Sequence, residues 1–118
     1  MLNYTMTYFG FAPTSGKHRI MRMKKKEDIL SSLAAEKPAL QTRFRVRRLA
    51  LFGSYARGDQ QPGSDVDILV DVDPSIGLDF VTLADRIEQL LGLPVDLVSS
   101  RAVKPAYRRE IETDLIYV

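Results

Sequence analysis

Residues 46–73 read VRRLALFGSYARGDQQPGSDVDILVDVD, and the order of apolar runs and turn residues in this stretch decides the fold. The apolar run 46–52 ends at Gly53-Ser54, which predicts a buried strand leading into a turn. A second strand is predicted over 65–72, because its even positions are all Val or Ile while aspartates occupy most of the odd ones. Pro and Gly residues between the two runs turn the chain back from one strand into the next.

Helical spacing of apolar residues predicts helices on both sides of this stretch. Residues 24–44 show it with an interruption at Pro38, so we expect two short helices there. Residues 78–91 are typical of an amphipathic helix, 95–98 of a short third strand, and 105–116 of a final helix. The order ααββαβα predicts an α+β fold, with a small mixed or antiparallel twisted sheet covered on one face by helices.

The 118-residue chain has the composition of one globular domain. Hydrophobic residues make up 45% of it, and no apolar run approaches the roughly 20 residues that span a bilayer, so no membrane protein is expected. With no cysteine and one histidine, the chain lacks the residues for disulfides, cysteine nucleophiles and His-rich zinc sites. Any metal must therefore be bound by oxygen. The first twenty residues show no signal-peptide pattern, so we expect a cytoplasmic protein.

Charge and periodicity separate the beginning of the chain from the rest. Residues 1–22 show no sustained period and are interpreted as an irregular or non-native lead-in, and residues 23–118 as the folded domain. Residues 1–50 hold eleven Lys/Arg and three Asp/Glu, a net charge of +8, whereas residues 51–118 hold six and twelve, a net charge of −6. The basic part, including the arginines at 43, 45, 47 and 48, is interpreted first as exposed side chains and second as a docking surface for an acidic or nucleic-acid partner.

The segment GSYARG (53–58) has the residues of a phosphate-binding turn. Gly53 lets the backbone turn sharply and approach a ligand closely, and Ser54 offers a hydroxyl and a backbone N–H group at the start of a helix. Such a helix start accepts phosphate. Arg57, in the first turn, is interpreted as a phosphate ligand, with a plain surface charge as the alternative.

Asp65, Asp67 and Asp96 are the candidate metal ligands. Asp65 and Asp67 lie two apart on a predicted strand, so they share a face about 6.6 Å apart and can converge on one or two Mg²⁺ ions. The chain has neither a G-x-x-x-x-G-K-[ST] nor a G-x-G-x-x-G segment, so a divalent metal would have to neutralise nucleotide phosphates. Asp96, in PVDLV (94–98), is an ionised group among apolar neighbours that this metal would compensate. The alternative is an exposed Asp on an edge strand.

A second Asp-x-Asp pair, Asp71 and Asp73, lies at the other end of the same predicted strand. Asp67 and Asp71 are about 13 Å apart by the strand rise and cannot share a metal ion, so the second pair is interpreted as solvated. A Gly-Ser alone is typical of a turn, and an Asp-x-Asp alone of a solvated strand edge. The fixed gap of ten residues between Ser54 and Asp65, with a buried strand on either side, favours a site.

GSYARG (53–58), SDVDILV (64–70) and PVDLV (94–98) together resemble the minimal nucleotidyltransferases of the DNA polymerase β-like nucleotidyltransferase superfamily. The resemblance covers residues 23–118. It implies that Gly53 and Ser54 hold the phosphates of the nucleotide, that Asp65 and Asp67 bind magnesium, and that Asp96 is the third catalytic carboxylate. It also implies an antitoxin paired with a HEPN-domain ribonuclease toxin, onto whose tyrosine AMP is transferred from ATP.

The expected reaction is magnesium-dependent nucleotidyl transfer, in which an acceptor hydroxyl attacks the α-phosphorus of ATP and pyrophosphate leaves. Two metal ions held by the three aspartates would assist it. So small a domain leaves little room to recognise a second substrate, so the acceptor is expected on a partner protein, in a hetero-oligomer with the toxin. The alternatives are an antitoxin that acts by binding alone and a transferase for small molecules such as aminoglycosides. Nucleic-acid binding is disfavoured, because carboxylates repel phosphates.

Overall fold

The computed structural model describes residues 24–118, so the predicted lead-in over residues 1–22 lies outside the described residues. Its elements in chain order are α2 (Lys26–Phe44), β1 (Val46–Phe52), α3 (Gly53–Arg57), β2 (Val66–Val72), η3 (Pro74–Ile76), α4 (Asp79–Leu91), β3 (Val95–Ser99), η4 (Ser100–Ala102), α5 (Pro105–Glu112) and β4 (Ile116–Tyr117). The α+β fold class is confirmed, and β1 occupies the residues predicted for it. No helix within residues 24–118 is long and apolar enough to cross a membrane.

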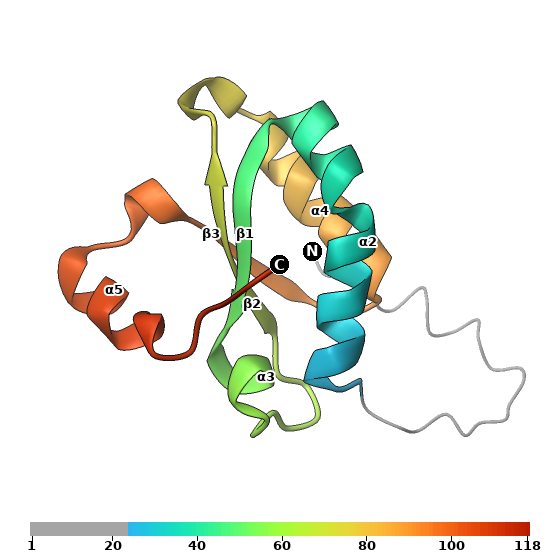
Figure 1. Cartoon of the computed structure of the whole chain (residues 1–118), viewed down its shortest axis with the longest axis vertical. Helices are drawn as coiled ribbons and strands as arrows, with labels where there is room; N and C mark the ends of the chain where they lie inside the picture. Colours follow the sequence, from blue (N-terminus) through green and yellow to red (C-terminus); the bar gives the residue numbers. More distant parts are fainter. Residues whose placement is uncertain (1–23) are drawn as a thin grey trace, which may run out of the picture.

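One four-stranded mixed sheet, in the order β3-β2-β1-β4, forms the centre of the molecule. β1 runs antiparallel to both β2 and β4, while β2 and β3 are parallel. The parallel pair requires a crossover, and α4 provides it between β2 and β3. Figure 1 shows α2 and α4 side by side on one side of the sheet and α5 on the other.

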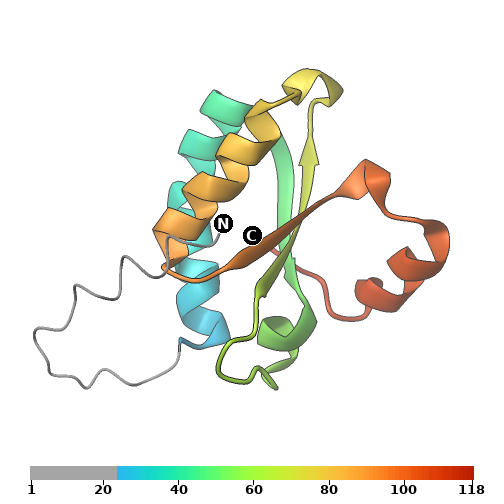
Figure 2. The same ribbon diagram turned by 180° about the vertical axis from the view of Figure 1, so that it is seen from behind.

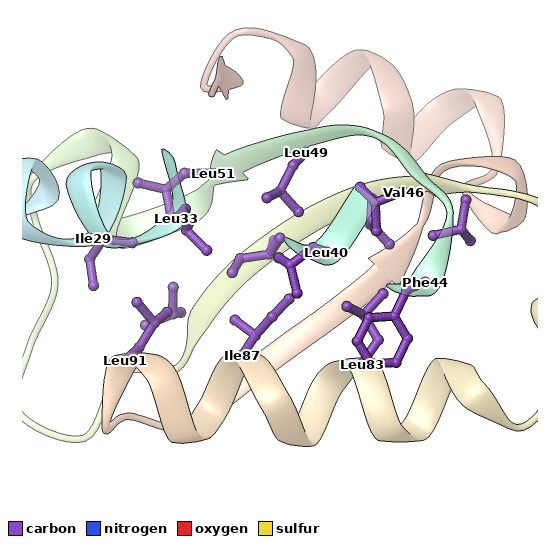
Figure 3. Packing of buried hydrophobic residues seen from close by; sticks show 14 of the residues in the cluster. Ile29, Leu33, Leu40, Phe44, Val46, Leu49, Leu51, Leu83, Ile87 and Leu91 are labelled. Carbon is purple, nitrogen blue, oxygen red and sulfur yellow. The ribbon is translucent and has the colours of Figure 1, made fainter. Parts of the chain in front are cut away.

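The main core lies between the sheet and the helices α2 and α4. Side chains from all three layers meet there, as Figure 3 shows: Ile29, Leu33, Leu40 and Phe44 from α2, Val46, Leu49 and Leu51 from β1, and Leu83, Ile87 and Leu91 from α4. The even positions of β2 point into the same core and are fully or almost fully buried. The odd positions of β2, which carry the aspartates, therefore face the opposite side.

Helices cover both faces of the sheet, so the prediction of a single covered face is wrong. On the second face, Ile111 of α5 packs against Ala50, Phe52 and Leu69. Figure 2 shows α5 on the far side of the sheet from α2 and α4. Because side chains alternate between the two faces of a strand, Ala50, Phe52 and Leu69 lie on the second face of the sheet. Another layer of the protein must pack on them to remove their apolar surface from water. α5 covers this face only in part, so the aspartates on the same face remain accessible.

Pro38 does not divide the first helical segment, so the prediction of two short helices is wrong. α2 continues through it as one helix of 19 residues. An interior proline costs about 3 kcal/mol, but Leu40 and Phe44 reach the core only if the helix continues, and burying each side chain contributes about 2 kcal/mol. Pro38 itself lies on the exposed side of the helix.

The end of the chain also differs from the prediction of a helix over residues 105–116. α5 ends at Glu112, and β4 follows as a two-residue strand that pairs with the edge of β1. The backbone N–H of Val118 donates to the carbonyl oxygen of Leu49 at 3.0 Å. These bonds satisfy the open edge of β1.

Candidate active site

Gly53 forms the turn between β1 and α3, directly against Asp67. Its φ of +76° lies in the region that favours glycine. A Cβ atom added to it would lie 2.1 Å from Oδ2 of Asp67, so no larger residue fits here without displacing that carboxylate. The turn predicted to hold phosphate and the predicted metal-binding strand therefore meet in the structure.

The register of the sheet brings Asp96 beside Asp67. The two residues are partners in the parallel pairing of β2 with β3, and both alternate away from the main core. Asp65 precedes β2 by one residue and shares the parity of Asp67. The side chain of Asp96 is exposed, because its apolar neighbours Val95 and Leu97 point toward the main core. Our expectation that apolar surroundings force a compensating partner on Asp96 is therefore wrong, although its position next to Asp67 is that of a third carboxylate.

The pKa of the Asp67 carboxyl group is strongly raised. Burial and, to a lesser degree, the negative charges of Asp96 and Asp65 raise it from 3.8 to about 6, while Arg57 acts in the opposite direction. A half-buried carboxylate with two acidic neighbours is a position where a cation would be stabilised.

An open cleft of about 320 Å³ lies over Gly53, Ser54 and Asp67. Its lining consists of Phe52, Gly53, Ser54, Arg57, Asp67, Tyr107, Glu110, Ile111 and Asp114. One wall thus comes from the β1–α3 turn and β2, and the other from α5 and the residue two positions after it. The structure brings Gly53, Ser54, Arg57 and Asp67 together in this cleft, while Asp65 and Asp96 adjoin Asp67 outside its lining.

Arg57 is held by two carboxylates. Its Nε lies 3.1 Å from Oδ2 of Asp59, and its Nη1 lies 2.9 Å from Oδ2 of Asp114. Asp59 is a near neighbour in sequence and is well exposed, whereas Asp114 comes from beyond α5 and its side chain is only 17% exposed. The guanidinium group that we interpreted as a phosphate ligand is therefore tied to the opposite wall of the cleft.

Residues 36–118 match the nucleotidyltransferase domain family, which is most of the chain. The chain belongs to this family. Among its relatives is the protein adenylyltransferase MntA of Thermococcus cleftensis, which is 44% identical over 100 residues, covering 83% of this chain and all of that protein.

Two solved structures share the fold of this nucleotidyltransferase. One, described as a candidate minimal nucleotidyltransferase, is 30% identical with a TM-score of 0.68, over 86% of this chain and 98% of that one. The other is a toxin–antitoxin crystal structure with AMP-PNP, 26% identical with a TM-score of 0.58, over 80% of this chain and 72% of that one. The minimal nucleotidyltransferase resemblance found in the sequence is confirmed.

The carboxylates in the site of this nucleotidyltransferase are suitable ligands for Mg²⁺. Within residues 24–118, no three Asp, Glu, His or Cys side chains are close enough to enclose a metal ion by themselves. Mg²⁺ is commonly held by one or two carboxylates, with water and substrate phosphates completing its shell. The half-buried Asp67, with Asp65 and Asp96 beside it and the Ser54 cleft in front of it, is a donor set of this kind.

The wall contributed by α5 was missed by the sequence reasoning. Tyr107, Glu110 and Asp114 lie 40 or more residues after Asp67 and carry no local pattern that marks them as site residues. Their place follows from Ile111, whose packing on the second face of the sheet brings α5 over the cleft. The sequence signal that could have indicated this wall was Ile111, an apolar residue in a helix of mostly charged side chains.

The remaining charged candidates have structural partners. Asp71 pairs with Arg48 at 3.5 Å, and Asp73 accepts hydrogen bonds from Ser75, which lower the pKa of its carboxyl group. Arg47 lies 3.8 Å from Asp73. The first interpretation of these arginines, as exposed side chains, is therefore confirmed for Arg47 and Arg48, which make ion pairs within the chain. Tyr55 is buried in the main core, as a packing residue.

Proposed function

We propose that this chain is a magnesium-dependent protein adenylyltransferase that transfers AMP from ATP to a tyrosine hydroxyl of a partner HEPN toxin, and so acts as its antitoxin in the cytoplasm. The observation that supports the reaction type is the close approach of the Gly53 turn, predicted to bind phosphate, to the carboxylate of Asp67. The similarity to MntA supports a protein as the acceptor.

The residues of the cleft divide into a phosphate side and an acceptor side. On the phosphate side, the Ser54 hydroxyl and the backbone N–H groups of the turn donate hydrogen bonds to phosphate oxygens, and the Arg57 guanidinium adds a positive charge. On the acceptor side, Asp96 adjoins Asp67 just outside the lining, and one of its carboxylate oxygens accepts the proton of the attacking hydroxyl. Magnesium ions held by Asp65, Asp67 and Asp96 would supply neutralisation of the triphosphate and stabilisation of the leaving pyrophosphate.

The size and shape of the cleft favour an acceptor that arrives on another protein. A volume of about 320 Å³ is near the lower limit of small-molecule pockets and suffices for one nucleotide. The described residues form one domain around it. A partner surface that closes over the open cleft would complete the site, which supports a hetero-oligomer with the toxin.

A transfer assay tests this function. The purified chain is incubated with Mg²⁺, ATP labelled at the α-phosphate and the toxin encoded beside it, and the label is located by mass spectrometry. We expect label on a toxin tyrosine, none when the label is at the γ-phosphate, and none with Asp67→Asn. The matched control is Asp71→Asn on the same strand, outside the cleft, which should retain transfer.

The outcomes separate the alternatives. If Asp67→Asn still neutralises the toxin as well as the unmodified chain does, the antitoxin acts by binding alone. If the purified chain modifies an aminoglycoside or a similar small hydroxyl compound without the toxin, the acceptor is a small molecule. If no acceptor takes label in the presence of Mg²⁺ and ATP, the transferase function is wrong.

A further inference from the structure

Tyr107 is a potential acceptor hydroxyl inside the cleft of the chain itself. It lies in the first turn of α5 and lines the cleft together with Ser54 and Asp67. The residue is 44% exposed, so it is accessible from the solvent. The described residues contain two other tyrosines: Tyr55 is buried in the main core, and Tyr117 is 49% exposed on β4 but does not line the cleft.

Tyr107 lies on the acceptor side of the cleft. Asp67 and Glu110 line the same cleft as Tyr107. Partial burial raises the pKa of the Tyr107 phenol, and the charges of Asp67, Asp96 and Glu110 act in the same direction. Asp67 and Asp96 are the pair that the sheet register places side by side. The phenol is therefore neutral in the free chain and has carboxylates nearby that can accept its proton.

We propose that Tyr107 is a site of self-adenylylation, modified by the cleft of the same molecule. This inference rests on the proposed adenylyl transfer from ATP. The Tyr107 Oη attacks the α-phosphorus, and an O–P bond forms while the bond from the α-phosphorus to the bridging oxygen of the β-phosphate breaks. Pyrophosphate leaves with that electron pair, and the phenolic proton passes to a carboxylate oxygen of Asp96 or Asp67 and then to water.

The position of Tyr107 gives this modification a consequence for the enzyme. The transferred AMP would remain attached to the cleft wall, in the space of about 320 Å³ that the next ATP needs. Because that volume suffices for about one nucleotide, the modified chain should bind ATP more weakly. Self-modification would thus be limited to one AMP per chain and would reduce later transfer to a partner.

Intact-mass and peptide analysis test the proposal in the absence of any partner. The full chain is incubated with Mg²⁺ and ATP, and the mass gain of one AMP group is assigned to a peptide. We expect the group on Tyr107. Tyr107→Phe should lower labelling to background, while Tyr117→Phe, which removes the other exposed tyrosine hydroxyl within residues 24–118, should leave labelling unchanged. Asp67→Asn should abolish it.

Dilution distinguishes transfer within one molecule from transfer between molecules. For transfer within one molecule, the fraction of chain labelled per unit time stays constant when the protein is diluted, and Asp67→Asn chains mixed with Tyr107→Phe chains take no label. A labelling rate that rises with protein concentration, label on another residue, or unchanged labelling of Tyr107→Phe overturns the proposal. If the toxin is labelled but the chain is not, self-adenylylation fails while the proposed function stands; if neither is labelled, the proposed function fails.

Discussion

Gly53 meets two requirements that only glycine meets together, a φ of +76° and a gap too small for a Cβ against Asp67. We therefore expect Gly53→Ala to push the Asp67 carboxylate out of the cleft and to strain the turn. The strain and the steric conflict should lower the free energy of unfolding by about 2–3 kcal/mol and abolish transfer. Chemical denaturation and the transfer assay measure the two effects.

Gly63 offers a matched control for that substitution. It also has a positive φ, +91°, but an added Cβ would meet nothing within 4 Å. Gly63→Ala should cost about 1 kcal/mol of stability through backbone strain alone and keep transfer. Equal loss of transfer in both variants would mean that backbone strain, and not the contact with Asp67, explains the need for glycine at position 53.

The raised pKa of Asp67 predicts how the metal-free chain responds to pH. With a pKa of about 6 in the folded state and 3.8 as its ordinary value, the folded chain binds more protons than the unfolded chain between these pH values. Stability should therefore fall as pH rises through this window. Asp67→Asn removes the charge and should raise the free energy of unfolding by about 1 kcal/mol near neutral pH, a figure reduced for partial solvent screening.

Denaturation in the presence of a chelator measures this difference. The gain from Asp67→Asn should disappear below about pH 4, where the carboxyl group is protonated in both states. A variant less stable than the unmodified chain at neutral pH would contradict the electrostatic account of this site. The charge of Asp67 thus lowers the stability of the metal-free chain, and the same charge would bind the cation.

At the scale of elements, α5 and the segment after it hold one wall of the cleft against the other through Arg57 and Asp114. We expect Asp114→Asn to release the Arg57 guanidinium from its place beside the phosphate side. Because Arg57 would no longer be held beside the phosphates, KM for ATP should rise several-fold with a smaller change in kcat.

Asp59→Asn is the control, because Asp59 contacts the same guanidinium but is exposed and lies on the near side of the cleft. It should change KM by less than about twofold, as expected of a solvent-exposed ion pair. Steady-state kinetics against ATP distinguishes the two variants. A larger effect from Asp59→Asn would show that the link across the cleft does not position Arg57.

Elements differ in how far their own residues determine them. The strand 46–52 is marked by its apolar run and by the Gly-Ser that follows, so its bounds could be predicted. The continuation of α2 through Pro38 depends on core contacts made by Leu40 and Phe44, which local propensity does not contain. The two residues of β4 are too few for a periodic pattern, and their pairing with β1 exists only in the folded chain.

At the scale of the whole molecule, the sequence predicts the part of the site whose residues are close together in the chain. Gly53, Ser54, Asp65 and Asp67 belong to one stretch, and the turn between the strands brings them together. The neighbouring position of Asp96 depends on the register of a parallel pair, which the crossover through α4 sets and which the sequence does not state. The wall from α5 depends on packing against the second face of the sheet, so it could be found only in the structure.

The distribution of charge over the whole molecule leads to a test of metal binding that needs no activity. Residues 51–118 carry a net charge of −6, and three of their aspartates, Asp65, Asp67 and Asp96, occupy neighbouring positions at one end of the sheet. A ligand that binds only the folded chain stabilises it by RT ln(1 + [L]/Kd), about 1.4 kcal/mol at a tenfold excess over Kd. For a domain of this size, Mg²⁺ should therefore raise the melting temperature by about 5–10 °C.

Calorimetry at constant ionic strength, with a monovalent salt replacing MgCl₂, separates specific binding from general screening of the acidic half. Asp67→Asn should lose most of the Mg²⁺-dependent shift. Asp71→Asn removes the same charge from the other end of the same strand, where Arg48 is its partner, and should keep the shift. If both variants respond to Mg²⁺ as the unmodified chain does, the ion acts on overall charge, and the carboxylates around Asp67 do not form its site.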